Sequence, residues 1–320
     1  MAHLPGKKII PHILSVLPVL FVVSLIVFGM GYLVPGNEAA LLLGEASSQE
    51  DIVLLENRLQ LHEAPPLLYL RWLGNMLKGN FGLSTANSVR VSSLITGHLF
   101  PTFSLAFFSL FIALAVSLPL GMLAAGKKDS LADRGLSTLA LLGISLPGFL
   151  LGLLLMMLFA VRLRWFPVAA YRPLSAGLLP HLRSIALPAL SLGLIHAGLL
   201  MRLLRASLLD ELGKSYVSMA RAKGSGEIHI LLHHAFRNIL STLISPILQS
   251  FTAILSGAAV IESLFGIPGL GSLLVASIGR RDFLVIRTLV LLAALLNVIL
   301  NLFGDLVIAR VDPRVRFGDD

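Results

Sequence analysis

Six long stretches of the sequence contain no Asp, Glu, Lys or Arg and are almost wholly apolar. A helix that crosses a bilayer needs about 20 such residues, whereas membrane-spanning strands are shorter and alternate in polarity. The stretches therefore predict an all-α, polytopic membrane protein with six transmembrane helices. They are Ile9–Val34, Pro101–Gly126, Gly135–Val161, Ile185–Met201, Asn238–Ile261 and Thr288–Gly304.

The composition supports a membrane environment over a soluble one. Charged residues make up 13% of the 320 residues, whereas soluble domains carry about 25%. The net charge of +8 raises the question of nucleic acid. However, the basic residues flank apolar stretches, and orientation in a membrane explains that placement better. Nucleic acid is therefore not an expected partner. The chain also has no cysteine, which excludes thiolate chemistry.

We expect a single transmembrane domain over residues 1–320. The first stretch follows Lys7 and Lys8, as a signal peptide would, but it is much longer than the apolar core of about 7–15 residues in a signal peptide. It is therefore read as a retained helix. The expected spans are about 9–34, 101–126, 135–161, 185–205, 238–261 and 284–309. An outer segment at 35–100 contains Glu50–Leu61, where short amphipathic helices are expected, and a cytoplasmic loop covers 206–237.

The distribution of Lys and Arg predicts the orientation of the chain. Basic residues are denser on the side that holds both termini, the 126–135 loop and the 202–237 loop, and cytoplasmic segments are enriched in Lys and Arg. We therefore expect a multi-pass protein of a prokaryotic cell (inner) membrane with both termini in the cytoplasm. Exceptions on the outer side are Arg162, Arg164, Arg280 and Arg281.

The 202–237 segment predicts two short helices separated by a turn. Asp210–Lys223 contains good helix formers, Gly224 is suited to end a helix, and a second helix is expected over Glu227–Arg237. Such a segment can lie on the bilayer surface with its basic side chains on lipid phosphates, or it can dock onto a cytoplasmic partner. Composition leaves these two interpretations about equal.

Specific motifs support the docking interpretation. The sequence Tyr216-Val-x-x-Ala220-Arg-Ala-Lys-Gly224, followed by His234-Ala-x-Arg-Asn238, resembles the coupling loop of permease subunits of binding-protein-dependent ABC importers. The resemblance is to the dipeptide, oligopeptide and nickel branch and covers essentially the whole chain, although Asn37 replaces the Asp usual in the family. Further matches are Pro35-Gly36, Ser145–Phe149, Trp165–Pro167, Arg202–Arg205, Glu262–Gly271, Arg281–Phe283, Asn301–Asp305 and Asp312–Arg314.

The resemblance implies the role of the chain and its partners. Two permease subunits form the pathway, two cytoplasmic ATPase subunits or domains lie beneath them, and an extracytoplasmic solute-binding protein delivers a peptide, nickel or a metal chelate. The chain itself is then no enzyme and binds no cofactor or metal, because ATP and Mg²⁺ belong to the ATPase partners. The residues implied to couple to the ATPase are Tyr216, Ala220, Arg221, Ala222, Lys223, Gly224, His234, Arg237 and Asn238.

Some polar residues lie within the apolar stretches and are candidates for the pathway or the bundle interior. They are Glu262, Asn297, Asn301 and Asp305. Ionisable groups within a span usually face the bundle interior or a pathway, whereas the two asparagines are read as interhelical hydrogen-bonding groups, and His196 is likewise read as structural. We expect the face that carries Asn297, Asn301 and Asp305 to pack against other helices. Asp305 is expected to pair with a basic residue, for which the candidates are Arg202, Arg205 and Arg310.

Two other classes of function remain as alternatives. A passive channel or carrier would also be a helical membrane protein, but it has no need of an ATPase-coupling loop. An intramembrane hydrolase would need a zincin motif or a Gly-x-Ser-x-Gly elbow, and the sequence has neither. Three histidines cluster at His229, His233 and His234, but they lack the carboxylate partner expected of a metal site.

Overall fold

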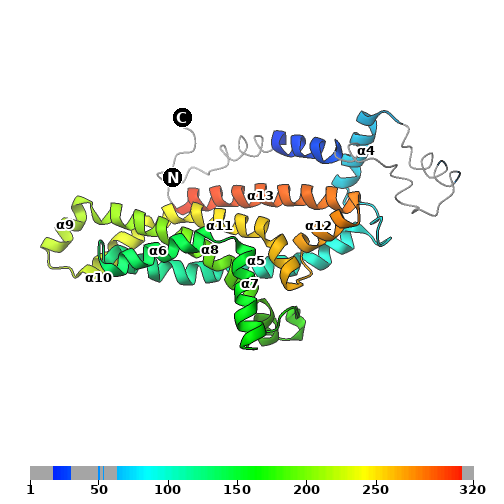
Figure 1. Cartoon of the computed structure of the whole chain (residues 1–320). Coiled ribbons are helices and arrows are strands. Elements are labelled where there is room, and N and C mark those ends of the chain that lie inside the picture. The colour runs from blue at the N-terminus through cyan, green and yellow to red at the C-terminus, as the bar shows by residue number, and fades with distance from the viewer. Residues whose placement is uncertain (1–16, 30–49, 51–52, 54–62, 312–320) are drawn as a thin grey trace. The chain divides into compact units, whose positions relative to one another are not determined.

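The computed structural model describes residues 17–29, 50, 53 and 63–311 (Figure 1). Within these residues every regular element is a helix, apart from an isolated bridge between Leu83 and Arg90. The elements are Leu17–Gly29, α4 Pro65–Leu77, α5 Val91–Gly126, α6 Leu131–Ser145, α7 Gly148–Leu155, η1 Met156–Arg162, η2 Leu174–Ala176, α8 Leu178–Leu212, α9 Ser215–Ala222, α10 Glu227–His229, η3 Ile230–Ala235, α11 Phe236–Phe265, α12 Leu270–Gly279 and α13 Phe283–Val311.

Four of the described helices are long and apolar enough to cross a membrane, and the bent pair α6 and α7–η1 makes a fifth if it counts as one span. The four are Val91–Gly126, Leu178–Leu212, Glu227–Phe265 and Phe283–Val307. An all-α membrane fold is thereby confirmed. The expected first span lies only partly within the described residues, as the apolar helix Leu17–Gly29, so the count of six stays a prediction. The helix expected over Glu50–Leu61 and the Asp312–Arg314 motif lie outside them.

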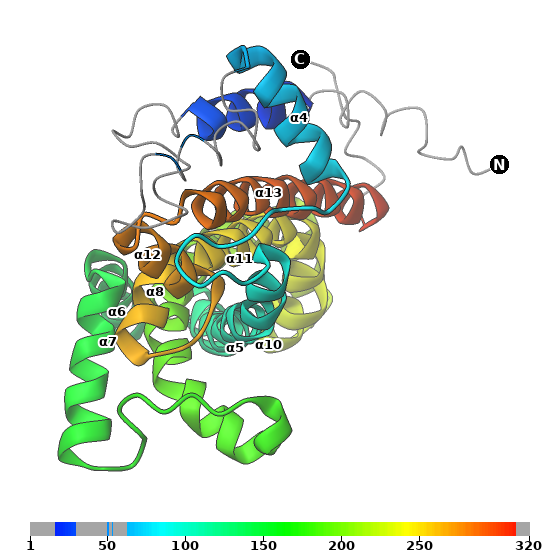
Figure 2. The same cartoon turned by 90° about the vertical axis from the view of Figure 1, so that its right-hand side faces the viewer.

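The third apolar stretch is one run in the sequence but two helices in the structure. Helix α6 ends at Ser145, α7 begins at Gly148, and their axes differ by 103°. Leu146 is extended (φ −84°, ψ 129°), which is the conformation that a residue before proline prefers. Pro147 also lacks the N–H that would continue α6. The chain therefore turns here, and Figures 1 and 2 show α7 leaving the direction of α6.

The chain divides into two compact units, which are described separately. The larger, Phe100–Ser272 with Ile299–Asp320, contains a bundle in which α6, α8, α11 and most of α5 run side by side (Figure 1). Two glycines on α8 allow close packing. A Cβ at Gly193 would lie 2.7 Å from the carbonyl oxygen of Ser109 on α5, and one at Gly198 would lie 2.7 Å from that of Ala140 on α6. Small residues at helix interfaces let membrane helices pack by van der Waals contact.

The smaller unit, Met1–Leu99 with Leu273–Val298, is joined by polar contacts between distant segments. Asp282 is 2% exposed. It accepts a hydrogen bond from the Ser84 hydroxyl and a weaker one from the Val285 N–H in the first turn of α13. Ser24 and Tyr69 share a buried 2.7 Å hydrogen bond. The Arg281–Phe283 motif thus places a buried carboxylate at the start of α13, where unpaired N–H groups need acceptors.

Candidate functional site

The segment between α8 and α11 forms a hairpin at one end of the bundle, where α9 and α10 are labelled in Figure 1. The expected helix Asp210–Lys223 is wrong in its detail, because α8 ends at Leu212 and a separate helix, α9, begins at Ser215. Lys214 between them is extended (φ −75°, ψ 152°), which breaks the helical hydrogen-bond ladder. The short helix α9 is therefore free to take its own direction.

The second expected helix, Glu227–Arg237, also differs from the structure. It does not stop near Arg237 but continues through the wide π-type turn η3 into α11, so that one helix runs over Glu227–Phe265. A π turn inserts an extra residue into the helix and often occurs at functional sites. The turn therefore links the hairpin directly to a membrane-spanning helix, without a flexible joint.

Gly224 ends α9 in the left-handed conformation that its position in the sequence predicts. Its φ is +87°, its N–H donates to the Arg221 carbonyl at 2.9 Å, and the Ser225 N–H donates to the Ala220 carbonyl at 3.1 Å. These two bonds form the Schellman motif that commonly ends helices. A Cβ at Gly224 would meet no atom within 4 Å, so the backbone conformation alone favours glycine.

A buried carboxylate fixes the base of the hairpin. Glu211, 7% exposed at the end of α8, accepts hydrogen bonds from Lys214 Nζ at 2.5 Å, the Tyr216 hydroxyl at 2.8 Å and Asn238 Nδ2 at 3.2 Å. Asn238 Nδ2 also donates to the Tyr216 hydroxyl at 3.1 Å. Burial, and next the bond to Glu211, raise the pKa of Tyr216, so its phenol stays protonated and keeps donating. The network joins α8, α9 and α11.

The outer part of the hairpin combines two buried side chains with an exposed surface. Val217 on α9 and Ile230 on η3 are fully buried and anchor it. Arg221 pairs with Glu227 across the turn, with Nε–Oε1 2.7 Å, but both side chains are more than two-fifths exposed, and such pairs contribute little stability. The exposed surface, here named the coupling tip, combines apolar and basic side chains: Met219, Arg221, Lys223, Ile228 and Leu232.

The structure brings together some of the predicted coupling residues and separates others. Tyr216 and Asn238 belong to the Glu211 network, and Gly224 shapes the turn. The His229 and His233 rings stack with centroids 4.3 Å apart, and His234 lies edge-on to His229. No group of three metal-ligating side chains occurs among the described residues. The remaining predicted residues lie on the surface of the hairpin: Ala220, partly buried, and Ala222, Lys223 and Arg237, exposed.

The polar residues predicted for the pathway or bundle interior have different surroundings. Glu262 is fully buried on α11 and accepts hydrogen bonds from the Thr102 hydroxyl of α5 at 2.6 Å and the Ser272 N–H of α12 at 2.9 Å. It thus ties three helices together. Asn297 donates to its own helix, at the Ala293 carbonyl, and Asn301 is exposed. The packing of this face and the partner of Asp305 stay predictions.

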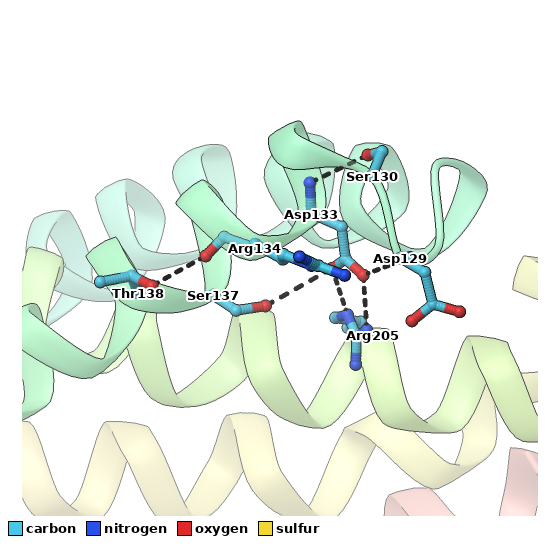
Figure 3. Close-up of polar contacts among 7 residues, drawn as sticks. All are labelled: Asp129, Ser130, Asp133, Arg134, Ser137, Thr138 and Arg205. Carbon is cyan, nitrogen blue, oxygen red and sulfur yellow. Dashed lines mark hydrogen bonds and ion pairs between the residues drawn. The ribbon is translucent and has the colours of Figure 1, made fainter.

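A further buried carboxylate, Asp133, is not among the residues singled out from the sequence. Asp133, with its side chain 3% exposed at the start of α6, binds Arg205 of α8 through two bonds of 2.5 and 2.6 Å (Figure 3). The Asp129 N–H and, more weakly, the Ser137 hydroxyl also donate to it. Arg205 is also one of the three candidate partners for Asp305, and that pairing stays a prediction. The pair clamps α6 to α8 near the hairpin.

Comparison with known proteins agrees with this architecture. A family model described as the binding-protein-dependent transport system inner membrane component matches residues 117–317. A probable peptide ABC transporter permease from Sinorhizobium fredii is 32% identical over 98% of this chain and all of its own length. A putative peptide transport system permease from Brucella abortus is 36% identical, and the glutathione transport system permease GsiC of Salmonella paratyphi A is 34% identical, each over 97% of this chain and 98% of the relative.

The fold is also similar to that of a solved structure, the MetNI methionine ABC transporter in an inward-facing conformation. The TM-score is 0.57 at 18% identity, and the match covers 68% of this chain and 96% of that chain. The fold and the family match define the membrane component of a transport system. The chain belongs to the binding-protein-dependent transport system inner membrane components, and it is a permease subunit of an ABC importer.

Proposed function

We propose that this permease carries peptides across the cell membrane, driven by ATP hydrolysis on partner subunits that dock onto the hairpin between α8 and α11. The peptide class follows from the relatives, two of which are described as peptide permeases and one as a glutathione permease. Nickel and metal chelates are the alternative solutes, because permeases of the same family branch handle them and the sequence motifs also allow them. A second permease subunit, a solute-binding protein and two ATPase subunits or domains complete the transporter.

The observation that carries the coupling proposal is the contrast within the hairpin. Its base is fixed by the buried Glu211 network, and Gly224 sets the turn, whereas the coupling tip is exposed and partly apolar. An exposed apolar and basic surface on a rigid support suits a groove on a partner protein. Because the hairpin continues into α11 without a break, a displacement of the coupling tip by the partner is transmitted to a membrane-spanning helix.

The orientation of the chain forms part of the proposal. The coupling tip faces the cytoplasm, where ATP is available, and the basic residues near both ends of the chain favour the same side. Six spans then place both termini in the cytoplasm. Reporter fusions at Asn57 and Ser225 test the arrangement. We expect opposite sides for the two reporters, and the same side for both contradicts it.

Substitution of two neighbouring glycines tests the coupling proposal. Gly224 has a φ of +87° and Gly226 a φ of −69°, and a Cβ added at either position would meet no atom within 4 Å. Valine at 224 strains the backbone by about 1–2 kcal/mol, whereas valine at 226 adopts an ordinary conformation. In proteoliposomes holding the whole transporter, we expect Gly224→Val to reduce ATP-driven peptide uptake and peptide-stimulated ATP hydrolysis together, and Gly226→Val to leave both nearly unchanged.

The same pair of variants distinguishes ATPase docking from the alternative that the hairpin only lies on the lipid surface. If the hairpin only rests on lipid phosphates, Gly224→Val leaves ATP-coupled uptake and co-purification with the ATPase subunits at the level of the unmodified chain. That result overturns the coupling proposal. Uptake of the same peptide by the permease pair in vesicles that lack ATP would instead support a passive carrier.

A further inference from the structure

The loop between η1 and α8 forms an arginine-lined pocket on the larger unit. The cavity has a volume of about 500 Å³, and three arginines from separate parts of the loop and of α8 line it together with Trp165. None of the lining residues is acidic. The residues that line the pocket and carry the argument are Arg164, Trp165, Arg172, Leu179 and Arg183.

Hydrogen bonds, of which the one between His181 and Ser104 is buried, hold the loop in place. His181, 1% exposed on α8, contacts the carbonyl oxygen of Arg172 through Nδ1 at 2.7 Å and the Ser104 hydroxyl of α5 through Nε2 at 2.7 Å. Arg183 donates from Nε and Nη2 to the Trp165 carbonyl at 3.1 and 2.7 Å. The pocket is therefore a preformed feature of the fold, which reduces the entropic cost of binding.

The positive charge in the pocket has no counterpart within the described part of the chain. The side chains of Arg164 and Arg172 form no hydrogen bond or ion pair with any described residue, and both are exposed. In the sequence, no Asp or Glu occurs between Asp133 and Asp210. Planar guanidinium groups bind carboxylates and phosphates through paired hydrogen bonds, so the pocket is complementary to an anion.

The surroundings of the pocket are those of a membrane surface. The loop follows directly on the apolar α7–η1 segment and precedes α8, whose 35 residues extend about 50 Å, longer than the roughly 30 Å hydrocarbon core. The pocket and the hairpin at the other end of α8 therefore lie near opposite faces of the membrane. Trp165 is 56% and Leu179 76% exposed. Exposed Trp and Leu next to Arg are typical of the interface, where rings and chains lie beside lipid.

We propose that this pocket binds the phosphodiester headgroup of an anionic phospholipid, in the leaflet opposite the hairpin. Arg164 and Arg172 hold the phosphate oxygens, Arg183 supports the pocket wall through Trp165, and Trp165 and Leu179 contact the glycerol and upper acyl chains. An acidic protein surface offers carboxylates to the same arginines, but it does not account for the exposed Leu and Trp side chains between them. The site also explains why arginines occur in this loop, although the outer side of the membrane has the lower density of Lys and Arg.

The test measures lipid binding to the full-length chain by native mass spectrometry in detergent with added phosphatidylglycerol. The double variant Arg164→Gln/Arg172→Gln removes both unpaired guanidinium groups and keeps the Arg183 bonds to Trp165. The control Lys128→Gln/Arg162→Gln removes the same charge from exposed residues that do not line the pocket. We expect about tenfold weaker phosphatidylglycerol binding for the double variant and little change for the control.

Two further arms separate the possible sources of the anion. Complete displacement of the bound lipid by excess glycerol phosphate identifies a free-phosphate site and contradicts the lipid proposal. Phosphatidylcholine is expected to bind more weakly than phosphatidylglycerol, and equal binding of the two lipids contradicts the requirement for net negative charge. Equal phosphatidylglycerol binding by the double variant and the control overturns the proposal. The proposal also fails if the double variant keeps its lipid but loses cross-linking to the solute-binding protein, because the pocket then serves a protein partner.

Discussion

The ion pair between Asp133 and Arg205 makes a quantitative prediction about the bundle. Its carboxylate is 3% exposed and its guanidinium 26% exposed, so the two partners differ in their access to water. Removing one partner of a fully buried pair costs roughly 3–5 kcal/mol, because the remaining charge is left uncompensated. The consequence of each substitution therefore depends on which charge remains.

Arg205→Leu is expected to be the more damaging substitution. It leaves the buried Asp133 carboxylate without its cation, and we expect a loss of about 3 kcal/mol in the free energy of unfolding. Asp133→Leu leaves Arg205, whose long side chain reaches water, and we expect a loss of roughly 1–2 kcal/mol. The double variant removes both charges and should be more stable than the sum of the single losses predicts, by about 2–3 kcal/mol.

Reversible unfolding of the full-length chain in mixed detergent and SDS micelles, followed by circular dichroism, measures these free energies. Asp129→Asn is the matched control. Asp129 contacts Asp133 through its backbone N–H and not through its carboxylate (Figure 3). The free energy of unfolding of this variant should therefore stay within about 0.5 kcal/mol of that of the unmodified chain. If Arg205→Leu costs less than about 1 kcal/mol, or if the double variant is additive, the pair does not clamp α6 to α8 and the reasoning is wrong.

Three further predictions concern the hairpin, α11 and the bend. Tyr216→Phe removes one hydrogen bond to the Glu211 carboxylate, about 1.5 kcal/mol, so amide hydrogens of α9 should exchange about tenfold faster, and unchanged exchange contradicts the network. Glu262→Ala removes the buried acceptor of two donors and should lower the free energy of unfolding by about 3 kcal/mol, measured in the same SDS titration; a loss below about 1 kcal/mol would be the opposing result. Pro147→Ala restores an N–H at the bend, and because proline maintains the bend, distances between spin labels on α6 and α7 should change. Unchanged distances would mean that packing maintains the bend.

The sequence predicts the membrane fold well because lipid imposes a simple rule on composition. Long apolar stretches need no tertiary information to be read as helices. Gly224 is predictable for a similar local reason, since a glycine after a run of helix formers is suited to a left-handed helix end, and its φ of +87° confirms it.

Long-range pairing is not predictable in the same way. Arg205 is a plausible partner for Asp305 from the sequence, but it binds Asp133, which is far away in sequence and lies at a helix start. Glu211 reads only as part of a helix, although a carboxylate followed closely by Gly and Lys is an available signal of a turn. The sharp bend at Pro147 escapes prediction because proline within a span is often tolerated without one. The pairings of Asp133 and Glu211 depend on which helices meet, and periodicity does not encode that.

Site-specific photo-cross-linking tests the central claim most directly, and the absence of cysteine from the chain allows a single label. Met219→Cys places a benzophenone on the exposed coupling tip, and Leu179→Cys places one at the opposite end of α8, both side chains being more than half exposed. In membranes that hold the whole transporter, we predict a cross-link from position 219 to an ATPase subunit that changes with ATP, and none from position 179. Cross-linking of position 219 to lipid alone, with no ATPase adduct in any nucleotide state, would contradict the account.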